Sequence, residues 1–192
     1  MDYSQYIRDY LNREKEVIDS LNIDELNEAM QKIVETYENE GTIYIFGNGG
    51  SATTASHFVG DFNKGVSEYT DKKFRFVCLN DNPATVLAIA NDIGYEEVYR
   101  FQLRNKVTPN DLVIGISGSG NSMNVVNAID YANSCGVPTI GITGFNGGKV
   151  RAMTQYHMHV PVDNMQFTED LHLIFDHMMM TILYQVWGIK AH

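Results

Sequence analysis

Residues 112–122 read Leu-Val-Ile-Gly-Ile-Ser-Gly-Ser-Gly-Asn-Ser, an uncharged, largely apolar run that passes directly into a loop of serine and glycine. A short apolar run bounded by turn residues is typical of a strand that is buried on both faces. A segment with helical periodicity, residues 123–134, follows without a break. A buried strand that turns through glycine and serine into a helix predicts one unit of a parallel α/β sheet.

The same order recurs along most of the chain. From Thr42 onward, short β-rich runs alternate with helical segments, and this alternation predicts a parallel sheet covered on both faces. The expected strands are residues 43–46, 74–79, 112–116, 139–142 and 157–160. The expected helices between them are residues 52–62, 84–91, 123–134 and 149–153.

Both ends of the chain are predicted to be helical. Residues 1–40 show apolar residues at helical spacing in two segments, and a long helix is expected from about Thr168 to Trp187. The last helix is apolar around most of its circumference, whereas a surface helix of a monomer shows a single apolar stripe. We therefore expect a homo-oligomer, a dimer or a tetramer, with a central core helix in a monomer as the alternative.

Composition limits the possible functions. The chain has 192 residues, 44% of them hydrophobic, and a formal net charge of -10. This charge argues against a general affinity for nucleic acid or for an anionic membrane. No apolar run approaches the roughly 20 residues of a membrane span, and the N-terminus lacks a secretory apolar region. We expect a soluble, cytoplasmic protein that forms one domain over residues 1–192, with 1–40 used in oligomerisation and 41–192 as the α/β core and last helix.

The strand-to-helix turns are the expected ligand site, because ligands of parallel sheets bind beyond the carboxyl ends of the strands. Residues 47–51, 117–122 and 143–148 are rich in glycine, serine, asparagine and threonine. Glycine lets backbone N–H groups approach an anion, and serine adds hydroxyl donors, so these loops predict a phosphate cradle. Tight turns with capping residues are the alternative. Neither the P-loop spacing nor the dinucleotide spacing is present, so no nucleotide cofactor is expected.

Two acid–histidine groups accompany these loops. His57 and Asp61 are four residues apart on one expected helix, so they share a face and can transfer protons, bind a metal or simply form a structural pair. Glu169 and His177 lie eight residues apart, or about 12 Å along a straight helix. One metal ion is therefore hard to hold with both on a single helix, and we expect different subunits to contribute them if both serve one kind of site.

Five segments together resemble the SIS-domain family, in order from about residue 30 to residue 185. The segments are GNGGSATTASHF, AIANDIGY, GISGSGNSMNV, GITGFNGGK and EDLHLIFDH. Within that family the chain is most similar to the phosphoheptose isomerases. The resemblance implies a three-layer, flavodoxin-like α/β fold with an N-terminal helical pair and a long C-terminal helix, and a homotetramer with active sites at subunit interfaces.

The resemblance also implies roles for individual residues. Asp61 and His177 are the expected catalytic pair, and a zinc ion, one per active site, is expected on His57, Asp61, Glu169 and His177. The phosphate is expected on the serines of residues 117–122. The implied substrate-binding residues are Asn48, Gly49, Gly50, Ser51, Asn91, Asp92, Ser117, Ser119, Ser122 and Glu169.

Three positions depart from the family pattern. Asp61 stands where the family has glutamate, Glu169 where it has glutamine, and Gly118 where it has threonine. Asp61 shortens the reach of the carboxylate by one methylene, which changes the geometry of proton abstraction. Glu169 adds a negative charge, which strengthens binding of a divalent cation.

The implied reaction interconverts sedoheptulose 7-phosphate and D-glycero-D-manno-heptose 7-phosphate through an enediol, as in heptose biosynthesis. Asp61 would act as base and His177 as acid. Asp61 cannot be a tight metal ligand and a free base at once, so those two roles compete. Two alternatives stay open: a non-catalytic phosphosugar-binding regulator or replication-initiator-associating adaptor, and another SIS reaction on a different sugar phosphate.

Overall fold

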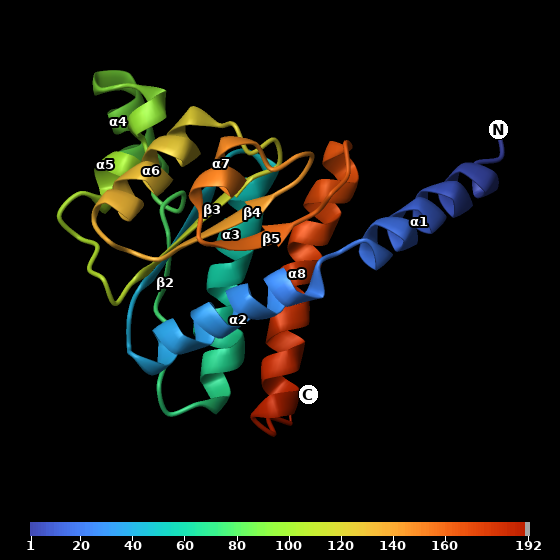
Figure 1. The fold of residues 1–192 in the computed structure, drawn as a ribbon, viewed down its shortest axis with the longest axis horizontal. Coiled ribbons are helices and arrows are strands. Elements are labelled where there is room, and N and C mark those ends of the chain that lie inside the picture. Colours follow the sequence, from blue (N-terminus) through green and yellow to red (C-terminus); the bar gives the residue numbers. More distant parts are fainter. Residues whose placement is uncertain (191–192) are drawn as a thin grey trace.

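The computed structural model describes residues 1–190. Its centre is a five-stranded parallel sheet in the order β2-β1-β3-β4-β5 (Figure 1). This order, 2-1-3-4-5, is that of flavodoxin-like folds, so the expected fold class is confirmed. The strands are β1 (Ile43–Gly47), β2 (Phe76–Cys78), β3 (Leu112–Ser117), β4 (Thr139–Thr143) and β5 (Tyr156–His159).

Helices cover both faces of the sheet. The α-helices are α1 (Ser4–Asp19), α2 (Ile23–Glu38), α3 (Gly50–Gly60), α4 (Pro83–Asp92), α5 (Arg100–Leu103), α6 (Met123–Ser134), α7 (Gly148–Met153) and α8 (Met165–Val186). One apolar core joins the sheet to α2, α3 and α8, and a second joins it to α4, α5, α6 and α7. The molecule therefore has three layers.

Successive side chains along a strand pack alternately into these two cores. On β3, Leu112, Ile114 and Ile116 belong to the core under α2, α3 and α8, whereas Val113 belongs to the opposite core. All six residues of β3 are buried. This strand lies at the centre of the sheet, so the uncharged sequence of residues 112–117 reflects burial on both faces.

Several expected boundaries were wrong: α3 begins and ends two residues earlier than predicted, β5 is shifted by one residue, and α5 was not predicted. Hydrogen bonds explain two further differences. The second strand was predicted at 74–79, but β2 covers only Phe76–Cys78, because the Phe74 N–H donates to Ser67 Oγ at 2.8 Å instead of to a neighbouring strand. The last helix begins at Met165, three residues earlier than expected, because Asn164 caps it and accepts from Phe167 N at 3.2 Å.

Helix α3 continues into a short π-helix, η1 (Asp61–Val66), which begins at one of the expected catalytic residues. Such wide turns are rare and occur frequently at functional sites. Two 3-10 turns, η2 (Ser67–Tyr69) and η3 (Tyr95–Glu97), complete the described chain. In residues 1–190, no helix is both long and apolar enough to cross a membrane.

Candidate active site and metal site

The loop after β1 is shaped by the contact between α3 and the sheet. A β-carbon at Gly47 would lie 2.6 Å from Ser51 Cβ and 2.9 Å from the carbonyl oxygen of Ile116. Glycine is therefore required where the loop passes between β3 and the first turn of α3. Gly49 has a φ of 55°, which turns the chain into the helix. Gly49, Gly50 and Ser51 consequently form the N-terminal end of α3, where N–H groups lack helical partners.

Asn48 is held by a network that joins three elements. Its Oδ1 accepts hydrogen bonds from the hydroxyls of Tyr95 at 2.9 Å and Tyr99 at 3.0 Å. Its amide also pairs reciprocally with that of Asn124, at 2.9 and 2.8 Å. Burial raises the pKa of Tyr99 to about 12, so its hydroxyl remains a neutral donor. Asn48 is thus fixed in orientation before any ligand arrives.

The serine loop after β3 is internally bonded as well. Ser117 Oγ donates to Ser122 Oγ at 3.1 Å, and Ser119 Oγ accepts from the backbone N–H of Asn121 at 3.3 Å. Gly120, with a φ of 67°, packs so closely on the next loop that a β-carbon would lie 1.9 Å from the carbonyl oxygen of Gly147. An adjoining hollow of about 510 Å³ is lined by Ser119, Asn121, Phe145, Asn146, Pro161 and Asp163.

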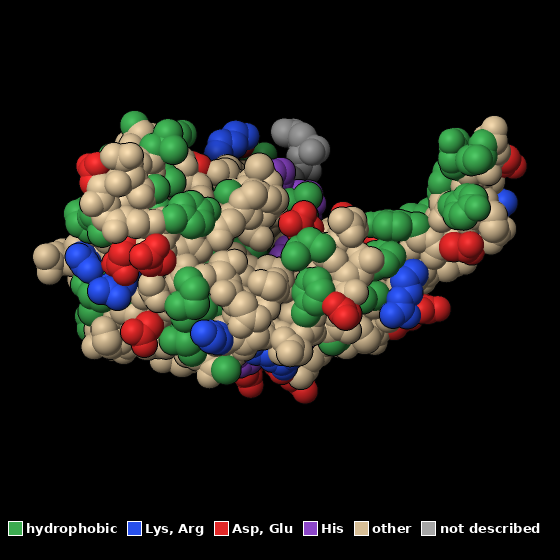
Figure 2. Space-filling model, turned by 90° about the horizontal axis from the view of Figure 1, so that it is seen from above, with side chains coloured by type: hydrophobic (Ala, Val, Ile, Leu, Met, Phe, Trp, Pro, Cys, Tyr) green, Lys and Arg blue, Asp and Glu red, His purple; other side chains and the backbone are tan. Residues whose placement is uncertain are grey.

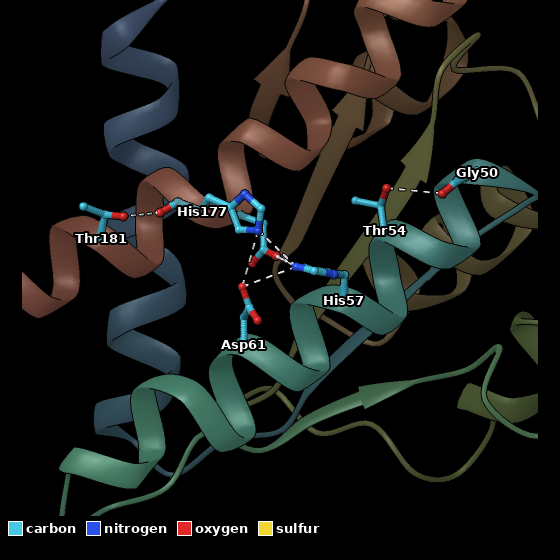
Figure 3. A network of polar contacts seen from close by, with 7 residues as sticks. Gly50, Thr54, His57, Asp61, His177 and Thr181 are labelled. Atoms are coloured by element: carbon cyan, nitrogen blue, oxygen red, sulfur yellow. Dashed lines mark hydrogen bonds and ion pairs between the residues drawn. The ribbon is translucent and has the colours of Figure 1, made fainter. Parts of the chain in front are cut away.

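Four side chains converge between α3, η1 and α8 (Figure 3). His57 Nε2 lies 3.0 Å from His177 Nε2 and 3.5 Å from Asp61 Oδ2. His177 Nε2 lies 3.8 Å from the same Asp61 oxygen. One candidate ligand atom from each of His57, Asp61, Asp176 and His177 lies within 4.8 Å of the other three. Three of the four expected metal ligands therefore meet within a single chain.

Asp176, the fourth member of this group, was not predicted from the sequence. Its side chain is fully buried, and neither carboxylate oxygen has a hydrogen-bond partner in the described part of the chain. Burial, with a smaller contribution from the Asp61 carboxylate, raises the pKa of Asp176 to about 8. The available signal was its position next to His177 in the otherwise apolar stretch of α8.

Glu169 lies apart from this group. Its carboxylate lies against Gly50, where a β-carbon would be 2.6 Å from Glu169 Oε2. Glu169 is thus beside the loop of residues 47–51. Its role as a metal ligand stays a prediction, since the four-residue group contains Asp176 instead.

Asn91 and Asp92 form the end of α4 and are exposed. The Asn91 amide donates to the Asp92 carboxylate at 2.8 Å. Three residues beyond Asp92, the Tyr95 hydroxyl reaches Asn48. The pair is therefore linked through a short turn to the loop after β1.

The 2-1-3-4-5 sheet and the glycine- and serine-rich loops at the carboxyl ends of its strands define an α/β protein of the flavodoxin-like class. The SIS-domain family matches residues 3–144. A phosphoheptose isomerase of Helicobacter pylori strain Shi470 is 37% identical over 151 residues, which is 79% of this chain and 78% of the relative. One from Aneurinibacillus thermoaerophilus is 30% identical over 187 residues, which is 94% of this chain and 93% of the relative.

A solved structure supports the same relationship. The phosphoheptose isomerase of Neisseria gonorrhoeae superposes with a TM-score of 0.86 at 25% identity, covering 96% of this chain and 100% of that one. This chain therefore belongs to the SIS-domain family, in its phosphoheptose isomerase group. The expected resemblance is confirmed.

Proposed function

We infer that the protein is an aldose–ketose isomerase that interconverts sedoheptulose 7-phosphate and D-glycero-D-manno-heptose 7-phosphate. The observation that carries this inference is the meeting of His57, Asp61 and His177 in one chain, with His57 on the helix that begins at the glycine-rich loop of residues 47–51. A regulator that only senses a sugar phosphate needs the loops but has no use for paired proton-transfer groups. The cluster therefore favours an enzyme over a binding module.

The proposed reaction moves two protons. Asp61, about one-quarter exposed, accepts the C–H proton next to the substrate carbonyl, and His177 donates a proton to the carbonyl oxygen, which gives a neutral enediol. The reverse transfers, at the neighbouring carbon and oxygen, complete the exchange of aldehyde and ketone. Both groups lie on helices packed against the sheet, so their spacing is set by the core rather than by a mobile loop.

The loops are proposed to hold the two ends of the substrate. Ser117, Ser119 and Ser122, with the glycine N–H groups between them, suit the phosphate because hydroxyl and amide donors need no added charge. A second set of residues, around the loop after β1, suits the sugar hydroxyls. That set consists of Asn48, Gly49, Gly50, Ser51, Asn91, Asp92 and Glu169.

The His/Asp group is proposed to bind zinc. Two ligands about 2.0–2.1 Å from a tetrahedral ion lie roughly 3.3 Å apart, and the closest pairs here are separated by 3.0 to 3.8 Å. A buried carboxylate without a partner also suits a dication. When bound, the ion supplies Lewis acidity toward a carbonyl oxygen. Because Asp61 Oδ2 and His177 Nε2 are the candidate ligand atoms, each can hold the ion or carry a proton, but not both at once.

The assembly is proposed to be a homotetramer that works in the cytoplasm. Figure 2 shows α1 standing away from the rest of the chain with hydrophobic side chains along it. Tyr6 and Ile7 on this arm are 72% and 57% exposed. An apolar groove between α2 and α8, lined in part by Met30, Val34 and Trp187, offers a second surface for another copy. Ile7→Glu should reduce the mass measured by light scattering if the arm joins subunits.

The test of the reaction is NMR of sedoheptulose 7-phosphate with purified protein, both metal-free and zinc-loaded. Wild type should produce the aldoheptose phosphate, and Asp61→Asn should be at least about 100-fold slower. Asp130→Asn is the matched control, an exposed acid on α6 that should behave as wild type. Absence of conversion in both metal states would contradict the proposed reaction.

A further inference from the structure

The carboxylate of Asp176 has no counterpart among the residues expected to act at this site. Asp176 follows Phe175 on α8 and is wholly removed from solvent. Its Oδ2 lies 3.8 Å from His57 Nε2, too far for a hydrogen bond, and neither oxygen is bonded elsewhere in residues 1–190. The side chain is therefore aimed at the His/Asp group without being satisfied by it.

A buried carboxyl group in this state either keeps its proton or is paired with a positive charge, because an unpaired ion in a protein interior is strongly unfavourable. A bound cation would supply that charge. The groups facing it are the imidazoles of His57 and His177 and the carboxylate of Asp61. Among residues 1–190, His57 is the only basic side chain within 4 Å of the Asp176 carboxylate. The two imidazole nitrogens and two carboxylate oxygens form a donor set that divalent transition metals bind, and its two negative charges balance a dication.

We propose that Asp176 is a ligand of a divalent transition-metal ion, completing with His57, Asp61 and His177 a four-donor site built within one subunit. Asp176 takes the place that the sequence assigned to Glu169, whose carboxylate lies against Gly50. This inference rests on the proposed metal site but not on the proposed substrate. A bound ion would then link α3 and η1 to α8.

The site also bears on the conflict between the two roles of Asp61. Asp176 is completely buried, whereas Asp61 is about one-quarter exposed. The buried carboxylate has access to the ion but little access to substrate, and the exposed one has access to both. Asp176 can therefore retain the ion during the time that Asp61 exchanges a proton.

The first experiment measures zinc affinity of the full-length, chelator-stripped protein by competition with a zinc-binding dye, with zinc-dependent thermal unfolding as a second readout. Wild type should bind one zinc per chain, Asp176→Asn should bind at least about 10- to 100-fold more weakly, and its zinc-dependent rise in melting temperature should shrink. Glu169→Gln is the matched control and should stay within about threefold of wild type.

A second experiment detects the ligand directly. With cobalt(II) in place of zinc, a thiolate ligand adds a sulfur-to-metal charge-transfer band in the near ultraviolet. Asp176→Cys should show this band and Glu169→Cys should not, whatever the effect of either change on stability.

Three results would overturn the inference. They are unchanged zinc affinity in Asp176→Asn, a charge-transfer band in Glu169→Cys rather than in Asp176→Cys, and failure of wild type to bind zinc at all. Conversion of sedoheptulose 7-phosphate by wild type in at least one metal state supports the proposed reaction whatever these binding measurements give. The two failures are thus distinguishable.

Discussion

The serine loop and the His/Asp group are built in opposite ways. In the loop, backbone and hydroxyl groups bond one another, as Ser117 does with Ser122. In the His/Asp group, side chains from distant parts of the chain approach one another, and Asp176 is left without any hydrogen bond in the described residues. The loop is therefore complete without a ligand, whereas the His/Asp group is not.

From this difference we expect the serine loop to serve substrate binding and the His/Asp group to serve the reaction. A loop whose hydrogen bonds are already formed holds its shape and loses little entropy when a phosphate arrives. An incomplete group of acids and imidazoles instead depends on protons or on a cation for its charge balance. Changes in the loop should therefore affect substrate affinity or stability, and changes in the His/Asp group should affect rate or metal content.

The largest effect is expected within the His/Asp group. His177→Gln should lower kcat by about 10²- to 10⁴-fold with KM within about threefold of wild type, because it removes a proton donor and leaves the phosphate loops intact. Steady-state kinetics by NMR measures both constants. Thr181→Ala removes only a hydroxyl that bonds the His177 carbonyl at 2.7 Å and should keep wild-type kcat. A rise in KM with an unchanged kcat would contradict the proposed division between a binding loop and a reacting His/Asp group.

The next largest effect is expected on stability, from Gly120 in the serine loop. Gly120→Ala should reduce the free energy of unfolding by about 3 kcal/mol or more, since the new β-carbon meets the Gly147 carbonyl and the φ of 67° is unfavourable for alanine. Gly136→Ala is the control, because Gly136 has a φ of 70° but open space around it. It should lose only about 1–2 kcal/mol. Urea unfolding of both variants tests this, and equal losses would mean that the close approach is unimportant.

A smaller, pH-dependent effect is expected on α8 next to the site. Burial lowers the pKa of His172 to about 4, so below its ordinary value of about 6.5 the unfolded chain takes up a proton that the folded protein does not. Between pH 7.5 and pH 5, wild type should lose about 2 kcal/mol of stability relative to His172→Leu. Urea unfolding in the presence of a chelator compares the two proteins. A pH-independent difference would mean that His172 takes up its proton in the folded protein as readily as in the unfolded chain.

The smallest effect should come from a single loop hydroxyl. Ser119→Ala should raise KM by about fivefold with kcat unchanged, because one neutral donor to a phosphate contributes about 1 kcal/mol when it is partly exposed. Ser134→Ala, which removes a hydroxyl at the end of α6, is the control. A fall in kcat without a change in KM would place Ser119 with the reacting groups.

Several features were predictable because they depend on local sequence. Apolar runs predicted the buried strands, and the alternation of strands and helices predicted the parallel sheet. Glycine and serine residues marked the loops. Periodicity also placed His57 and Asp61 on one face. The partners of Asn48 were not predicted, because Tyr95, Tyr99 and Asn124 are brought to it only by packing of η3 and α6 beside β1.

The sequence by itself determined the fold class, the glycine- and serine-rich loops and the family, since each is carried by residues close together in the chain. Only the tertiary structure decided which acids stand beside which histidines. Residues 57 and 177 are 120 positions apart, and their ring nitrogens meet at 3.0 Å because α3 and α8 pack on the same face of the sheet. The same packing buries Asp176 and leaves Glu169 beside Gly50. Side-chain partners across such distances depend on the geometry of the core, which no local pattern records.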